Sequence, residues 1–174
     1  SESERLAKEV EKKLKDAERL VKELHEEVDR MNRDLERKLR EISERAKKTT
    51  EDVERVAERG EDRREIDKDL RRVNKEVKDL IDKLEDEARK SHEEHARVLK
   101  EIEDRLREVL KEVEANNLPE EVIKKVRKDI EEITRKLERS NREHERTLRE
   151  IKKRAEKVHE DHRREIDRIR EELK

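Results

Sequence analysis

The sequence contains no cysteine, phenylalanine, tyrosine or tryptophan, and only one glycine and one proline in 174 residues. Without cysteine the chain has no disulfide framework, no thiolate metal site and no thiol nucleophile. A single glycine cannot build the glycine-rich loop that cradles a phosphate. No Phe, Tyr or Trp is present to stack on a nucleobase. We therefore expect no cofactor and no nucleic-acid partner.

Long apolar runs are missing as well. No apolar stretch approaches the ~18 residues that a membrane-spanning helix needs. We therefore expect no membrane partner. We also expect no signal peptide.

Charge dominates what is present. Charged residues make up 60% of the chain and apolar residues 28%, against roughly 25% and 45–50% in ordinary globular proteins. Low hydrophobicity of this kind is typical of disorder, but here the net charge is only −2 and the apolar residues are periodic. Acids and bases are interspersed, so the sequence shows no basic stripe for phosphate binding.

Two short segments interrupt the helical pattern. Gly60 suits the left-handed position that ends a helix, and Asp62 with Glu65 has the spacing of a capping box. Further along, Asn116 and Asn117 tolerate a helix-ending conformation, and Pro119 fits the first turn of a new helix. Ser1 with Glu4 forms another capping box. The predicted helices are about 2–58, 62–115 and 119–173.

Each predicted helix carries one narrow apolar stripe, which we call its seam. Along the seams, steps of three and four residues alternate, which gives a period between the 3.5 of a left-handed coiled coil and the 3.6 of a straight helix. Short connections make consecutive helices antiparallel neighbours. We predict an all-α fold: a single domain over 1–174, built as a nearly straight, antiparallel three-helix bundle with helices of about 55 residues.

The narrow seams also bear on partners. Three helices with one stripe each can bury those stripes against one another, so we expect a monomer. A binding module for a partner helix, or self-association, is the alternative. A few apolar residues lie beside the seams and could form a second stripe. They are Leu20, Ile81, Leu99, Leu110 and Ile123.

Polar residues interrupt the seams at Thr49, Ser91 and Ser140, with Asn74 next to the seam. The first three precede an acidic residue at capping-box spacing, so each imitates a helix start. The alternative is a polar core residue in an unbroken helix. The seam phase continues through all three positions without Gly or Pro, which favours unbroken helices.

Antiparallel register brings the unusual residues into two layers. Residue n of the first helix lies level with about residue 121−n of the second, and residue m of the second with about 235−m of the third. All six histidines fall into these layers. The first layer collects His25, Asn32, Ser91, His92, His95, Ser140, Asn141 and His144. The second collects Thr49, Thr50, Asn74, His159 and His162.

Three interpretations of the histidines remain open. Imidazole, hydroxyl and amide groups can satisfy one another in a buried hydrogen-bond network, and such a network specifies helix pairing. Alternatively, histidines that are buried in the neutral form make the fold sensitive to acid. The third interpretation is a metal site, because His92/His95 and His159/His162 each share a helix face. The structural network is favoured, and we predict no metal ligands.

No catalytic residues are predicted. Ser91, Glu94 and His95 lie close together in sequence, but neither an oxyanion hole nor a nucleophile elbow accompanies them.

The chain resembles computationally designed helical bundles with buried hydrogen-bond networks. The features that carry the resemblance are the Ser1-Glu2-Ser3-Glu4 start without Met, the Glu/Lys/Arg surface, the near-equal helices, the short turns and the polar seam layers. The resemblance implies a structural, non-catalytic protein. Buried His–Asn networks in that group have been used to build assemblies that come apart in acid, although those are usually oligomers. Spectrin-like repeats share the three-helix plan but have aromatic core residues.

Overall fold

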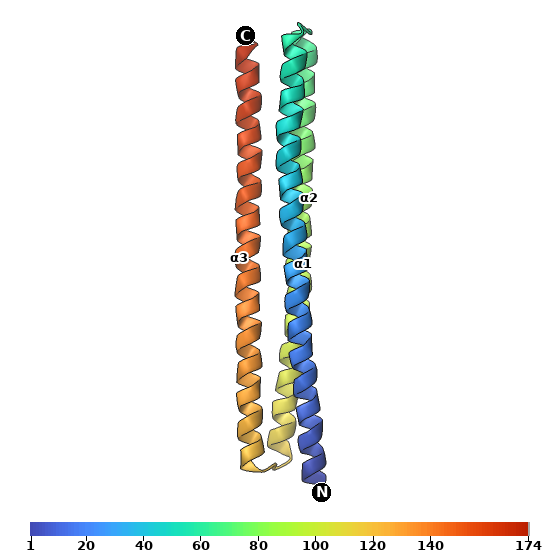
Figure 1. The fold of residues 1–174 in the computed structure, drawn as a ribbon, viewed down its shortest axis with the longest axis vertical. Coiled ribbons are helices and arrows are strands. Elements are labelled where there is room, and N and C mark those ends of the chain that lie inside the picture. Colours follow the sequence, from blue (N-terminus) through green and yellow to red (C-terminus); the bar gives the residue numbers. More distant parts are fainter. Residues whose placement is uncertain (174) are drawn as a thin grey trace. The chain divides into compact units, whose positions relative to one another are not determined.

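A computed structural model describes residues 1–173, which form three α-helices joined by two short turns (Figure 1). Helix α1 spans Glu2–Glu58, α2 spans Arg63–Ala115 and α3 spans Glu120–Glu172. The all-α three-helix prediction is confirmed. The bounds of α1 are as predicted, whereas α2 and α3 each begin one residue later than expected and α3 ends one residue earlier. The helices are unbroken at Thr49, Ser91 and Ser140. At these positions the periodicity of the seams predicted the structure correctly, and the capping-box spacing did not.

Both turns use a residue in the left-handed region. Gly60 has a φ of 81° and Asn117 a φ of 48°, as their types predicted. The Asn116 side-chain amide donates a hydrogen bond of 2.7 Å to the Glu112 carbonyl, which satisfies one of the free acceptors at the end of α2. Backbone conformation and side-chain capping together end the first two helices.

The helix starts are capped by their first side chains and carbonyls. Ser1 Oγ accepts a hydrogen bond from the Glu4 amide at 3.3 Å, which is one half of the predicted capping box. Asp62 Oδ1 accepts from the Arg64 amide, also at 3.3 Å. Pro119 lies just before α3, and its carbonyl accepts from the amides of Val122 and Ile123. Each contact supplies a partner that the first helical turn lacks.

The described chain divides into two compact units. Unit 1 combines residues 1–31 with residues 91–146, and unit 2 combines residues 32–90 with the chain from Thr147 onward. Each unit therefore contains a segment of all three helices. The prediction of a single domain is not tested by this division and stays a prediction.

Unit 1 has one apolar cluster, and every helix contributes to it. It is built from Val and Leu of α1, Ile, Leu and Val of α2, and Val, Ile and Leu of α3. Leu118, in the second turn, is also buried in it. Fully buried members include Val10, Ile102 and Val113. Burial of such a side chain stabilises a fold by about 1.5–3 kcal/mol, so this cluster is the main source of stability of unit 1.

Unit 2 has two apolar clusters separated by polar residues. One cluster includes Leu39, Val77 and Ile151, and the other includes Leu70 and Ile166. Along α1 the residues between the two clusters are Thr49 and Thr50, along α2 Asn74, and along α3 His162. The second predicted layer therefore interrupts the apolar core of unit 2.

No large hydrophobic side chain is exposed among residues 1–173. Ile81 is buried, and Leu20, Leu99, Leu110 and Ile123 are half-buried. The apolar residues beside the seams thus leave no open stripe over the described part of the chain. A search of the same residues for a helix long and apolar enough to cross a membrane finds none.

The turn between α1 and α2 allows a test of the role of the positive φ at Gly60. A methyl group on Gly60 would meet no atom within 4 Å, so a Gly60→Ala substitution is opposed only by the positive φ. We expect it to lower the free energy of unfolding by about 1–2 kcal/mol, as measured by urea denaturation. The control Arg59→Ala, at the exposed neighbour, should stay within about 0.5 kcal/mol of the parent. Equal effects of both substitutions would contradict this account.

Candidate functional site: the buried histidine layers

Three of the six histidines are buried in the core. The exposed fraction is 1% for His95, 0% for His144 and 4% for His162, and these are the three histidines that lie on the seams. His159 is half-buried, whereas His25 and His92 are exposed. Placing His25 and His92 in a buried network was therefore wrong. Each lies one residue off its seam, and one residue turns the side chain about 100° around the helix axis.

In unit 1 the predicted layer brings histidines of two helices into contact. The ring centroids of His95 on α2 and His144 on α3 are 4.6 Å apart, with an angle of 40° between the ring planes. His92, one turn from His95, stacks on His144 at 6.1 Å and 22°. The antiparallel register inferred from the two turns therefore brought the correct residues of α2 and α3 together.

Helix α1 contributes a methionine to this layer. Ser91 Oγ on α2 donates a hydrogen bond of 3.3 Å to the Met31 sulfur on α1. We did not single out Met31 from the sequence, although the register places it level with residue 90. Ser91 therefore directs its hydroxyl hydrogen to sulfur and not to His95, and a serine–histidine nucleophile pair is not formed.

The imidazoles of this layer have no hydrogen-bond partner among the described residues. Both nitrogens of His95, both nitrogens of His144 and the hydroxyl oxygen of Ser140 are buried without one. Asn141 is half-buried, and its side-chain amide donates to Glu145 at 3.4 Å. A hydrogen-bond network that links these side chains stays a prediction.

Burial sets the electrostatics of the pair. Loss of water is the main cause that lowers the pKa of His144 to about 4, and the nearby imidazoles of His95 and His92 contribute to the same shift. Burial also lowers the pKa of His95, with a second contribution from His92, while Glu145 acts in the opposite direction. Both rings are therefore neutral at pH 7, in a site where a positive charge on either ring disfavours one on the other.

Asn32 and Asn74 take intermediate positions. Asn32 falls in unit 2, and both asparagines are half-buried, each with a side-chain oxygen that is buried and without a hydrogen-bond partner. Each lies next to a seam residue in sequence. Their burial is partial because their side chains point to the flank of the seam.

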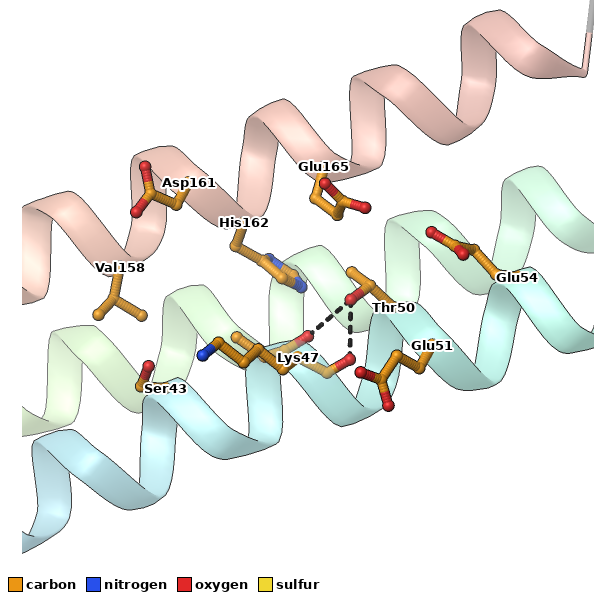
Figure 2. A pocket seen from close by; sticks show the side chains of 10 residues that line it. Ser43, Lys47, Thr50, Glu51, Glu54, Val158, Asp161, His162 and Glu165 are labelled. Atoms are coloured by element: carbon orange, nitrogen blue, oxygen red, sulfur yellow. Dashed lines mark hydrogen bonds between the residues drawn. The ribbon is translucent and has the colours of Figure 1, made fainter.

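The layer of unit 2 contains His162 and two threonines that bond to their own helix. Thr49 Oγ1 donates to the Ala46 carbonyl at 3.0 Å, and Thr50 Oγ1 donates to the carbonyls of Ala46 and Lys47 at 3.1 and 2.9 Å (Figure 2). Hydroxyls in helices commonly bond backward in this way. Because these donors are engaged, neither threonine donates to His162, whose two nitrogens have no partner in the described chain.

A cavity of about 280 Å³ opens beside His162 and is lined by carboxylates of α1 and α3 (Figure 2). Two of these, Glu54 and Glu165, already pair with the guanidinium of Arg168. That contact lowers the pKa of Glu165. Burial, with a smaller contribution from His159, lowers the pKa of His162. The cavity thus resembles a cation site in composition, but Arg168 already offsets part of its negative charge.

No group of three or more His, Asp or Glu side chains within residues 1–173 is arranged to hold a metal ion. His92 and His95 share a helix face as their spacing required, yet His92 is exposed and His95 is buried. His159 and His162 also share a helix face, but His159 is half-buried and His162 is buried. Spacing alone therefore did not produce a shared coordination site.

The unpartnered imidazoles generate a test of stability. We expect His144→Leu to raise the free energy of unfolding at pH 7 by about 1–3 kcal/mol, because it removes two buried nitrogens without partners. Urea denaturation would measure the change. The matched control His25→Leu, at an exposed position, should change stability by no more than about 0.5 kcal/mol. A loss of stability in His144→Leu would show that the ring has a stabilising partner.

Comparison with solved structures finds two matching chains. No protein-family model matches the chain, and no curated protein matches its sequence. A solved structure described as a computationally designed three-helix bundle is similar with 18% sequence identity and a TM-score of 0.43. The alignment covers 99% of this chain and 85% of that one. The assignment of the fold itself rests on the helices and turns of this chain.

Proposed function

We propose that the chain is a designed, non-catalytic structural bundle that exists as a monomer and whose buried polar layers restrict which residues of the three helices pair. The observation that carries the proposal is the burial of the seams. No large hydrophobic side chain remains exposed in residues 1–173, so the described chain offers no apolar stripe for another helix. The uniform Glu/Lys/Arg surface and near-equal helices support a designed origin.

The polar layers supply the specificity that an all-apolar seam lacks. Sliding one helix by a single turn, about 5.4 Å, keeps most aliphatic side chains buried. The same slide separates His95 from His144, so the two rings lose their contact. It also removes the contact of Ser91 with Met31. Polar layers of this kind disfavour shifted pairings more than they stabilise the native one.

The monomer is tested by sedimentation equilibrium over about a hundredfold concentration range. We expect a single species at the chain mass of 21.3 kDa, because the seams are already covered. A stable dimer or trimer would contradict the monomer. A mixture that shifts with concentration would do the same.

Specificity is tested with the triple variant His95→Leu, His144→Leu and His162→Leu. We expect this variant to be more stable at pH 7 than the parent but to populate additional oligomers, because leucine replaces the three buried imidazoles and makes the seams more apolar. Sedimentation of both proteins at equal concentration measures this. The control variant His25→Gln with His92→Gln changes only exposed histidines and should remain a single species. A triple variant that stays monomeric would show that the layers do not restrict pairing.

A second candidate function is a response to acid, and the contact of His95 with His144 favours it. The unfolded chain binds a proton at each imidazole near pH 6.5, whereas folded His144 does so only near pH 4. Its contribution to stability is therefore complete above about pH 6.5, falls as the pH falls, and is lost below about pH 4. The difference corresponds to about 3 kcal/mol for His144.

The acid response is tested by helicity and thermal stability between about pH 7.5 and 4. We expect the parent to lose stability already between about pH 6.5 and 5, above the range in which most carboxylates protonate. The triple leucine variant should be flat over that interval, and the His25→Gln, His92→Gln control should follow the parent. A parent that loses stability only below about pH 4 would eliminate the acid response while leaving the structural proposal intact.

A further inference from the structure

A groove in unit 1 gathers positive charge from two helices. It lies between α1 and α3, has a volume of about 730 Å³, and its walls carry Lys15, Arg19 and Lys22 of α1 with Lys136 and Arg139 of α3. Two carboxylates, Glu18 and Glu143, also line it. Five cations thus face two anions in a chain whose net charge is −2. No single segment of the sequence shows this excess, because it arises only where the two helices meet.

The cations of the groove are poorly neutralised by their neighbours. Among the described residues no ion pair within 4.0 Å involves Lys22, Lys136 or Arg139. Lys15 and Arg19 contact only acids of their own helix, at 3.7–4.0 Å. Exposed pairs of this length contribute little and are screened by salt. The positive charge of the groove therefore remains available to a ligand.

A buried hydroxyl accompanies these cations. Ser140 lines the groove with an exposed fraction of 5%, and its Oγ has no hydrogen-bond partner in the described structure. A serine inside a helix usually donates to the carbonyl one turn before it, but Ser140 does not. Because this oxygen is buried, a ligand in the groove meets the cations beside it and not the hydroxyl.

We propose that this groove binds a multivalent oxyanion, a ligand that carries several phosphate or sulfate groups. Guanidinium groups bind such oxygens through paired N–H donors, and ammonium groups bind them as point charges. The groove has no Phe, Tyr or Trp to stack on a nucleobase and offers only the imidazole of His25, so the recognised part is the anion. This function is independent of the structural role proposed above.

Calorimetric titration of tripolyphosphate into the full chain at low salt tests the proposal. We expect one site per chain, with affinity that decreases as salt is added because phosphate binding releases counterions. The variant Lys22→Glu, Lys136→Glu and Arg139→Glu should weaken binding more than about tenfold.

A matched control has the same change of charge elsewhere in unit 1. Lys100, Arg105 and Lys111 are exposed on α2, do not line the groove, and have no ion pair within the described residues. Their triple replacement by Glu should leave the affinity within about threefold of the parent. Equal weakening by both triple variants would overturn the proposal, because binding would then follow net charge alone.

The location of binding is read independently from backbone amide shifts of the parent chain. We expect shifts caused by tripolyphosphate to concentrate on residues 15–25 and 136–143, whether or not the groove variant folds. Shifts spread over all helices would overturn the proposal. So would an absence of binding, or binding of a single-stranded oligonucleotide without binding of tripolyphosphate.

Discussion

The structure depends on the burial of one narrow apolar stripe on each helix. Buried aliphatic side chains contribute about 1.5–3 kcal/mol each, whereas an exposed ion pair contributes about 0–1 kcal/mol. The many i, i+3 and i, i+4 pairs on the surface, such as Arg37 with Asp34 and Glu41, therefore stabilise individual helices but cannot choose how the helices assemble. Within each unit, the burial of the seams and the register set by the turns determine how the helices pair.

The properties of the histidine layers follow from the same constraint. A position on the seam is buried whatever side chain it carries, so His95, His144 and His162 lose their water as leucine would. The transfer of leucine from water to the core is favourable, whereas the transfer of an imidazole without a hydrogen-bond partner is unfavourable. The depressed pKa values and the contact of two neutral rings are therefore consequences of packing. The histidine layers stabilise the fold less than aliphatic residues at the same positions would.

The two charged cavities show how neighbours decide what a cluster of charges can do. Beside His162, Arg168 pairs with both Glu54 and Glu165, so part of the negative charge is already satisfied. In the groove of unit 1, Lys22, Lys136 and Arg139 have no such partner in the described residues. The two cavities are lined by charges of opposite sign, acidic beside His162 and basic in the groove, and they differ further in how far those charges are paired.

The sequence by itself determined the helices, their ends to within one residue and most of the residues that are buried. Periodicity fixes the angle of a side chain around the helix axis, which is why His144 was placed in the core, and it also explains why His25, one residue off the seam, is exposed. Only the tertiary structure decided the partners: Thr50 bonds to its own backbone, Ser91 to Met31, and five cations of two helices share a groove. For the last two the reason is geometric, since a hydrogen bond or ion pair between helices requires the side chains to meet within about 3–4 Å, which periodicity does not specify.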